Sequence, residues 1–350
     1  MQITEIPVPS HEKVLRVADP AIGLTGFIAV HSTQAGPAAG GLRMRPYDTE
    51  DAALADVLAL SRGMTLKTAA ADLPLGGGKA AIMGAAADLT EAQLRAMGHA
   101  IATLGGAYWT AEDMGLTPAD LKIVREETRF VAGLDAGPYA SGDPSPRTAR
   151  GVFYAMRVAA ERRFGRRDLT GRRVALQGLG HVGWHLAKLL KAAGADLVVA
   201  DIDPARAGQA AQTFGAEVVG PDAILTVPAD ILAPCAIGGV LTEAGAGDIR
   251  ARVICGAANT QLESVAAGDA LHAQGILYAP DYVANAGGIV NVAAEILQIE
   301  DRMSFVSARL AAMEAMMARI LDTAARAGVG PHRIADRLVA ERLELAGRAA

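Results

Sequence analysis

Two lysines and one aspartate in the first third of the chain have the types and surroundings needed for acid–base chemistry. Lys67 and Lys79 follow short runs of glycine and apolar residues, and Asp113 follows an apolar stretch that contains a Tyr-Trp pair. Such surroundings predict partial burial, and burial together with a neighbouring cation lowers the pKa of a lysine toward that of a usable general base. Asp113 could supply the matching carboxylate. Taken singly, each residue also fits a solvated surface position or a turn.

Other reactive groups in the sequence do not assemble into a site. The glycine cluster before Lys79 is not a phosphate-binding P-loop, because that motif requires glycine at the position of Leu73 and serine or threonine at the position of Ala80. His181 and His185 have the i, i+4 spacing of metal ligands, but no further ligand is identifiable, so no metal site is expected. The sequence also contains no Gly-x-Ser-x-Gly nucleophile elbow.

A glycine-rich turn at residues 178–183 predicts dinucleotide binding. It follows an apolar run, opens a helical stretch, and has Asp201 at the end of the next apolar run. In such a turn Gly178 permits the tight bend, Gly180 lets the backbone approach the pyrophosphate, and Gly183 allows close helix–strand packing. Asp201 would accept hydrogen bonds from the adenosine ribose and repel a 2′-phosphate, which favours NAD over NADP. A turn packed for structure alone is the alternative, and the nearby Arg206 leaves some tolerance of NADP open.

The elements around this turn indicate a doubly wound sheet. Strands are expected at 174–176, 197–200, 218–219, 231–233, 253–255 and 276–278, with helices over about 182–193 and from 204 to about 215 between the first of them. Alternation of this kind produces right-handed crossovers and a mostly parallel sheet. Ligands bind at the carboxyl edge of such sheets. The small, polar or turn-forming residues that follow these strands begin at Gly178, Asp201, Pro234, Gly256 and Pro280.

The first 140 residues have a different pattern. A strand is expected at 28–30 and helices over 50–64 and 91–104, with the glycine clusters at 40–41 and 76–78 interrupting them. Residues 141–146 read as a linker, with Ser145 as N-cap and Pro146 at the first helical position. The predicted class is α/β with two domains: 1–146, which contains the two lysines, 147–320 as a Rossmann-type NAD-binding domain, and a helical segment, 321–350, that returns to the first.

Composition excludes several classes of protein. The chain has 350 residues, of which 51% are hydrophobic and 20% charged, and this argues against disorder. No window of 18 apolar residues predicts a membrane span, and the start has no secretory signal pattern. A net charge of −5 without basic runs disfavours nucleic acid as a partner. Two cysteines, Cys235 and Cys255, are too few for a disulfide framework, which favours the reducing cytoplasm.

Six stretches together resemble the amino-acid dehydrogenases of the glutamate/leucine/phenylalanine/valine family, the leucine-type members most and the phenylalanine-type members next. The resemblance runs from about Ile28 to the carboxyl end. The stretches are Gly36-Pro-Ala-Ala-Gly-Gly41, Arg62-Gly-Met-Thr-Leu-Lys67, Pro74-Leu-Gly-Gly-Gly-Lys79, Thr110-Ala-Glu-Asp113, Ala233-Pro-Cys-Ala-Ile-Gly-Gly239 and Tyr278-Ala-Pro-Asp-Tyr-Val-Ala-Asn-Ala-Gly-Gly288. Two positions depart from the family pattern, since Leu42 replaces a common threonine and Thr260 the second residue of an Asn-Asn pair.

The resemblance implies reversible oxidative deamination of an L-amino acid to a 2-oxo acid and ammonia, with hydride passing to NAD. It implies that Lys67 pairs with the substrate carboxylate, Lys79 activates the attacking water, and Asp113 moves protons at the substrate nitrogen. The remaining substrate-binding residues implied are Ala39, Gly40, Gly41, Met64, Ala111, Asn285, Ile289 and Val292. The cofactor-binding residues implied or read from the fingerprint are Thr148, Gly178, Leu179, Gly180, His181, Val182, Gly183, Asp201, Ile202, Cys235, Ala236, Ala257, Asn259 and Asn285.

The implied side-chain pocket favours a branched aliphatic substrate. Ile289 and Val292 suit leucine, valine and isoleucine, whereas the small Ala39 resembles phenylalanine-type relatives and keeps an aromatic substrate open. A non-catalytic NAD-binding sensor is the alternative from another class, but it would not need the two lysines and the aspartate. A 2-hydroxy-acid dehydrogenase would need a catalytic histidine and a carboxylate-binding arginine, which do not assemble here. The family also implies a homo-oligomer, in which residues 1–146 form the domain for substrate binding, catalysis and oligomerisation.

Overall fold

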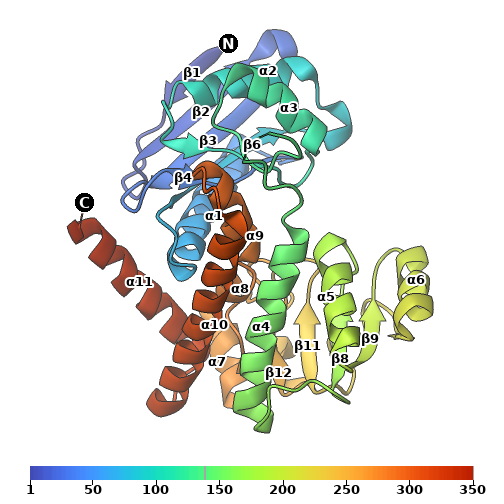
Figure 1. Ribbon diagram of the computed structural model, residues 1–350. Coiled ribbons are helices and arrows are strands. Elements are labelled where there is room, and N and C mark those ends of the chain that lie inside the picture. Colours follow the sequence, from blue (N-terminus) through green and yellow to red (C-terminus); the bar gives the residue numbers. More distant parts are fainter. Residues whose placement is uncertain (138, 350) are drawn as a thin grey trace. The chain divides into compact units, whose positions relative to one another are not determined.

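The computed structural model describes residues 1–137 and 139–349, and its contacts divide the chain into two compact units (Figure 1). The first unit comprises Met1–Asp143, Asn291–Val306 and Ala340–Ala350, and the second comprises Pro144–Val290 and Ser307–Val339. The expected ranges differ from this division in the last 60 residues, where the contacts assign 291–306 to the first unit and 321–339 to the second. Helical periodicity does not reveal which unit a helix packs on, so the sequence pattern had no means of assigning them.

The first unit is built on a mixed sheet with strand order β1-β2-β3-β6-β4-β7, in which β5 also pairs with β6. The strands β1 to β3 are antiparallel, whereas β6 runs parallel to β4 and β5. The strands are β1 Gln2–Glu5, β2 Lys13–Asp19, β3 Leu24–Ser32, β4 Ala38–Ala39, β5 Leu42–Arg45, β6 Gly76–Met83 and β7 Tyr108–Trp109. The helices are α1 Glu50–Ala70, α2 Glu91–Ala102 and α3 Pro118–Glu127, with short 3-10 turns at Pro20–Ile22 and Ala86–Asp88.

Each face of this sheet has its own helical layer. Because side chains alternate along a strand, Ala80 and Ile82 of β6 pack with α2 and α3, whereas Ala81 packs with α1. Burial of these apolar faces is the main stabilising term of the unit. The expected interruption at residues 76–78 is wrong, since these glycines begin the central strand β6. A Cβ on Gly77 would lie 2.1 Å from the backbone nitrogen of Thr65, so only glycine lets α1 approach so closely.

The second unit contains a six-stranded parallel sheet with the order β10-β9-β8-β11-β12-β13, which confirms the expected Rossmann-type domain. Its strands are β8 Arg173–Gln177, β9 Asp196–Ala200, β10 Glu217–Val218, β11 Ile231–Pro234, β12 Val253–Ile254 and β13 Leu277–Tyr278. Its helices are α4 Ser145–Phe164, α5 His181–Ala192, α6 Pro204–Phe214, α7 Val265–Ala273 and α8 Asp281–Ala284, with a 3-10 turn at Ala244–Gly247.

Three further helices complete the chain: α9 Gly287–Ile296, α10 Arg302–Ala327 and α11 Pro331–Ala349. The helical segment expected over 321–350 is interrupted after Ala327, where Gly328 has a φ of +66°, and its last residue, Ala350, lies outside the described residues. The start of α4 also differs by one position. Pro144 is its N-cap and Ser145 is already helical, so the Ser145 side chain does not cap the helix.

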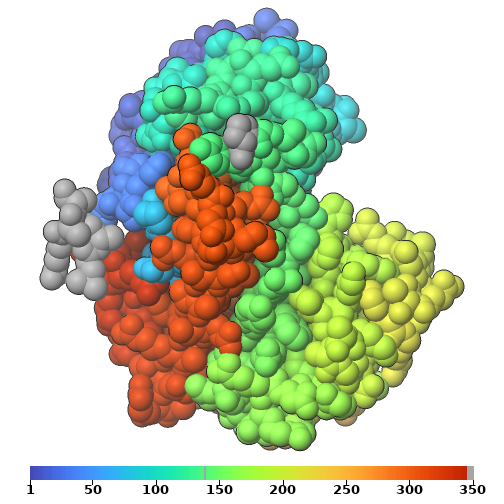
Figure 2. Space-filling model, in the orientation of Figure 1, coloured from blue at the N-terminus to red at the C-terminus, as the bar shows by residue number. Residues whose placement is uncertain are grey.

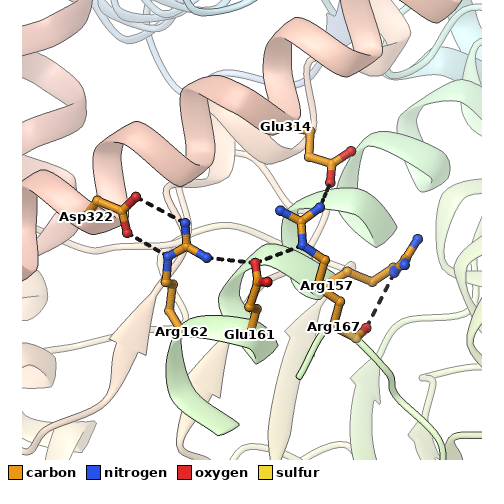
Figure 3. Close-up of polar contacts among 6 residues, drawn as sticks. All are labelled: Arg157, Glu161, Arg162, Arg167, Glu314 and Asp322. Atoms are coloured by element: carbon orange, nitrogen blue, oxygen red, sulfur yellow. Dashed lines mark hydrogen bonds and ion pairs between the residues drawn. The ribbon is translucent and has the colours of Figure 1, made fainter. Parts of the chain in front are cut away.

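An ionic network joins α4 to α10 within the second unit (Figure 3). Arg162 Nε donates to Asp322 Oδ1 at 2.6 Å, and Arg167 bridges Glu161 and Glu314. These side chains are substantially exposed, so each pair contributes little on its own. Figure 2 shows α4 in green against α10 in orange over a continuous surface. Among the residues that the structure describes, no helix is both long and apolar enough to cross a membrane.

Candidate active site

Strand alternation places two cations on the α1 face of the first sheet. In β6 the side chain of Lys79 lies on the same face of the sheet as that of Ala81, which packs with α1. In β5 the neighbours Leu42 and Met44 belong to the opposite core, so Arg43 also emerges on the α1 face. Lys79 is only 6% exposed. The expectation that this lysine is buried is therefore confirmed.

The glycine pair at 40–41 lets three chain segments converge beside Lys79. Here β4 and β5 pair with β6 one after the other in the same register, and Gly40 and Gly41 connect those two strands. A Cβ on Gly40 would lie 1.7 Å from the carbonyl oxygen of Gly78, and one on Gly41 would lie 2.7 Å from Asp113 Cβ. Larger residues would push these segments apart, so the pair sets the position of Asp113 relative to β6.

Lys79 and Asp113 form an ion pair with a distance of 2.5 Å between Nζ and Oδ2. Burial alone would raise the pKa of the Asp113 carboxyl, but Lys79 and Arg43 lower it more, and the result is a pKa well below the usual range. Asp113 is therefore a carboxylate at neutral pH. Its side chain remains 24% exposed, so a small molecule can reach it. A buried lysine beside an accessible carboxylate is an arrangement suited to proton transfer.

Sequence reasoning missed a third member of this cluster. Arg43 Nε donates to the same oxygen of Asp113 at 2.8 Å, and Arg43 also donates to Asp56 at 3.0 Å. Tyr47 Oη donates to Asp56 at 2.6 Å. The only sequence signal for Arg43 is an arginine between the apolar residues Leu42 and Met44, and a half-exposed strand has the same pattern.

The structure brings most of the other expected substrate-binding residues of this unit to the same glycine pair. Met64 Cγ would lie 3.3 Å from a Cβ on Gly40, and the Ala111 carbonyl oxygen 3.3 Å from one on Gly41. Ala39 is buried in β4 directly before the glycine pair. Lys67 lies one turn after Met64 in the last turn of α1, and the i, i+3 spacing gives both residues one face.

The remaining residues expected to form the pocket lie on α9. Val292 belongs to the first unit and is 6% exposed, whereas Ile289 belongs to the second. Leu42, which departs from the family pattern, is fully buried in the apolar core with Leu121 and Val124 of α3. A hydroxyl at that position would need a partner in an apolar environment, so leucine suits the core better.

In the second unit the glycine fingerprint has the geometry of a nucleotide-binding turn. Gly178 has a φ of +90°, which favours glycine, and a Cβ on Gly183 would lie 2.0 Å from the Gly178 carbonyl oxygen. A Cβ on Gly180 would meet nothing within 4 Å, so the turn is open there. Gly180 is the N-cap of α5 and no side chain caps the helix. The exposed His181 and the half-exposed Val182 thus begin a helix whose amide groups can receive an anion.

The end of β9 supplies a carboxylate and an apolar surface beside this turn. Asp201 accepts hydrogen bonds from the amides of Leu179 at 2.6 Å and Asp203 at 2.9 Å. Ile202 is 91% exposed. Ile237, which sequence reasoning missed, is 68% exposed in the loop after β11. Large apolar side chains at this exposure are consistent with a ligand that covers them.

Loops after β11 and β12 meet at the same edge of the sheet. A Cβ on Gly178 would touch Ala236, and the Cys235 thiol, whose pKa burial raises to about 12, accepts from the Ala257 amide at 3.4 Å. Asn285 Nδ2 donates to Asn259 Oδ1 at 2.9 Å. Among the described residues, the buried Asn285 Oδ1 has no hydrogen-bond partner.

Thr148 and Thr260 lie near this edge in different settings. Thr148 is in the first turn of α4, where its hydroxyl donates to the Pro144 carbonyl oxygen. The same hydroxyl lies close to Gly288, since a Cβ added to that glycine would be 2.6 Å from it. Thr260 directly follows Asn259 and has a φ of +52°. This left-handed conformation suits asparagine better than a β-branched residue.

Comparison with known proteins relates both halves of the chain to one family of dehydrogenases. Family models match residues 11–130 (Glu/Leu/Phe/Val dehydrogenase, dimerisation domain) and residues 141–205 and 204–344 (Glutamate/Leucine/Phenylalanine/Valine dehydrogenase). A leucine dehydrogenase of Bacillus cereus is 44% identical over 95% of this chain and 91% of its own length. A phenylalanine dehydrogenase of Lysinibacillus sphaericus is 43% identical over 83% of this chain and 77% of its own.

A solved structure supports the same assignment. The crystal structure of L-tryptophan dehydrogenase from Nostoc punctiforme superposes with a TM-score of 0.81 at 38% identity, and the match covers 96% of this chain and 97% of that one. These relatives share a reaction class and differ in the amino acid that they are named for. The chain therefore belongs to the glutamate/leucine/phenylalanine/valine dehydrogenase family, and it is an amino-acid dehydrogenase.

Proposed function

We propose that the protein catalyses NAD-dependent, reversible oxidative deamination of L-amino acids with branched aliphatic side chains, giving the 2-oxo acid and ammonia. The observation that carries this proposal is the buried Lys79–Asp113 ion pair in a member of the family. A protein that only senses NAD has no use for a buried lysine and an accessible carboxylate that a glycine pair allows to lie together. Desolvating such a pair costs free energy, and a catalytic role explains why the protein contains a pair that is unfavourable in this respect.

The fingerprint edge of the second unit fits a dinucleotide. The open space at Gly180 and the uncapped start of α5 suit a pyrophosphate, and the exposed Ile202 and Ile237 suit the flat faces of an adenine ring. The Asp201 carboxylate would bond to the ribose hydroxyls and repel a 2′-phosphate, so we propose NAD rather than NADP. When bound, the nicotinamide supplies the hydride acceptor.

The proposed roles of the first unit follow from charge and proton affinity. Lys67 neutralises the substrate carboxylate. Asp113, ionised at neutral pH, takes a proton from the substrate ammonium group so that the amine can release a hydride from Cα. Lys79, once it has lost its proton, takes one from the water that attacks the iminium carbon. Proton return by the same groups completes the loss of ammonia.

The preference for branched aliphatic side chains rests on the pocket residues and on the relatives. Ile289 and Val292 are branched, and Met64 offers an unbranched, adaptable side chain. Leucine dehydrogenases are among the relatives at 42–44% identity. Small apolar differences in a substrate change selectivity by only about 1–3 kcal/mol, so neighbouring substrates will overlap. Since the first half matches a dimerisation domain, we also propose a homo-oligomer.

The test is NADH formation at 340 nm with a panel of L-amino acids at alkaline pH. Leucine, valine, isoleucine, phenylalanine, tryptophan, methionine and glutamate are compared by kcat/KM, each with NAD and with NADP. A maximum among leucine, valine and isoleucine with NAD is expected. An aromatic maximum would replace the substrate proposal, and equal efficiency with both cofactors would end the NAD proposal. Absence of turnover with NADH still bound would favour the sensor alternative.

A further inference from the structure

The Asp113 carboxylate is held asymmetrically. Lys79 Nζ and Arg43 Nε both contact Oδ2, at 2.5 and 2.8 Å, and no described residue donates a hydrogen bond to Oδ1. The Asp113 side chain is 24% exposed, whereas the side chains of Arg43 and Lys79 are 11% and 8% exposed. One oxygen is therefore anchored by two cations from neighbouring strands. The other oxygen is left for a ligand.

Arg43 is itself fixed by a second carboxylate. Its NH1 donates to Asp56 Oδ2 on α1 at 3.0 Å, and Tyr47 Oη donates to the same oxygen at 2.6 Å. Arg43 thus spans from Asp56 to Asp113 with separate nitrogens of one rigid, planar group. Lysine has the charge but not this geometry.

We propose that Arg43 is a positioning residue for proton transfer, which fixes the Asp113 carboxylate with Oδ1 toward the substrate nitrogen and supplies a permanent countercharge to Asp113 in the step for which Lys79 has given up its proton. The proposal rests on the roles assigned above to Lys79 and Asp113. It adds a residue that acts through Asp113 and not by touching the substrate.

Electrostatics requires such a countercharge. If Lys79 were the only cation beside Asp113, loss of its proton would leave a largely buried carboxylate with no opposite charge. The Arg43 guanidinium stays protonated at every working pH, so it stabilises Asp113 whether or not Lys79 is charged. Among the described residues, Asp56 and Tyr47 contribute further titratable groups to the cluster, Tyr108 interacts electrostatically with Asp113, and Lys67 lies in the last turn of α1.

The test compares the pH profiles of kcat/KM for deamination in wild type, Arg43→Gln and Arg43→Lys. Arg43→Gln removes the charge and the geometry, so we expect kcat to fall at least tenfold and the alkaline rise of the profile to move to higher pH by half a unit or more. Arg43→Lys keeps the charge, so we expect a smaller fall in kcat and a profile close to wild type. KM for NAD should be unchanged in both variants.

A matched control removes an arginine elsewhere in the same unit. Arg95 is ion-paired with Glu91, Glu126 and Glu127 on the opposite side of the sheet, so Arg95→Gln should leave kcat and the profile unchanged. If Arg43→Gln does not fold, Arg43→Lys still tests the geometry, because a kcat equal to wild type would contradict the proposal. A folded Arg43→Gln with an unmoved profile would overturn it.

Lys79→Ala separates this inference from the proposed function. Loss of turnover in Lys79→Ala together with wild-type kinetics in Arg43→Gln would overturn only the role of Arg43. Turnover retained in Lys79→Ala would overturn the underlying role of the lysine.

Discussion

The two units offer different groups of the chain for chemistry. In the first unit, charged side chains from β5, β6, α1 and the loop after β7 form a largely buried cluster in which every member contacts another. In the second unit, the fingerprint edge offers amide groups, three glycines and the carboxylate of Asp201, and the apolar Ile202 and Ile237 are exposed. Proton transfer requires fixed charges with tuned pKa values, whereas phosphate binding requires space and unpaired amides.

The comparison indicates how each half should respond to mutation. A change in the charged cluster alters proton affinity and should appear in kcat and in the pH profile. A change at the fingerprint edge alters the space left for the nucleotide and should appear in nucleotide affinity. Glycine is important in both units for different reasons. In the first unit it lets one chain segment approach another. In the second unit, at Gly180, it leaves space for a ligand.

The largest effect expected on stability comes from Gly183→Ala. Its Cβ would lie 2.0 Å from the Gly178 carbonyl oxygen, so the backbone must shift, and we expect a loss of about 3 kcal/mol in the free energy of unfolding. Gly180→Ala is the matched control for stability, because nothing lies within 4 Å of its Cβ. It should retain the wild-type melting temperature while weakening NADH binding. Equal melting temperatures for both variants would contradict the packing argument.

Asp113→Asn tests the charged cluster through acid stability. The pKa of Asp113 lies below its unfolded value of about 3.9, so its ion pairs stabilise the fold fully above that pH and lose their effect as the pH falls toward the folded value. At pH 7 we expect Asp113→Asn to be less stable by about 2 kcal/mol, since it removes the carboxylate partner of the buried Lys79 and leaves Arg43 paired with Asp56 alone. Thermal melts should show this difference shrinking below about pH 4. A difference independent of pH would show that the ion pairs are not its source.

Asp201→Ser tests the Asp201 carboxylate at the fingerprint edge. Removing its charge lifts the repulsion of a 2′-phosphate, so the ratio of kcat/KM for NAD over NADP should fall about tenfold, or about 1.4 kcal/mol. Asp196 lies at the exposed amino end of the same strand, and Asp196→Asn should leave the ratio unchanged. An unaltered ratio in Asp201→Ser would remove Asp201 as the determinant of cofactor choice.

The smallest effect expected is a gain in stability from a substitution at Thr260. Thr260 has a φ of +52°, a conformation that costs a β-branched residue of order 1 kcal/mol. Thr260→Asn should therefore raise the free energy of unfolding by about 1 kcal/mol in a urea titration. Thr260→Val keeps the branching and should give no gain. A gain of the same size in both variants would exclude backbone strain as the cause.

The sequence predicted the second unit well because its signals are local. The fingerprint, the alternation of strands and helices, and Asp201 at a strand end are all patterns within short windows. The first unit was predicted less completely. The glycines at 76–78 form a central strand because α1 presses on them, and α1 continues to Ala70 through buried serine, threonine and alanine residues that give no apolar periodicity.

Arg43 shows why part of the candidate site stayed hidden. A cation between two apolar strand positions is the usual pattern of a sheet with one solvated face. Only the structure shows that α1 covers this face and that Asp56 and Asp113 lie on either side of the guanidinium. Burial of a charged strand face depends on contacts between residues 13 to 70 positions apart, which no local pattern records.

The most direct test of the central claim is a pair of measurements on Lys79→Ala: turnover at saturating substrate, and NADH affinity by fluorescence titration. The account assigns proton transfer to the first unit and nucleotide binding to the second. It predicts a fall in kcat of at least 10³-fold with an NADH dissociation constant within twofold of wild type. Turnover within tenfold of wild type, or parallel loss of turnover and NADH affinity, would contradict the division of labour between the two units.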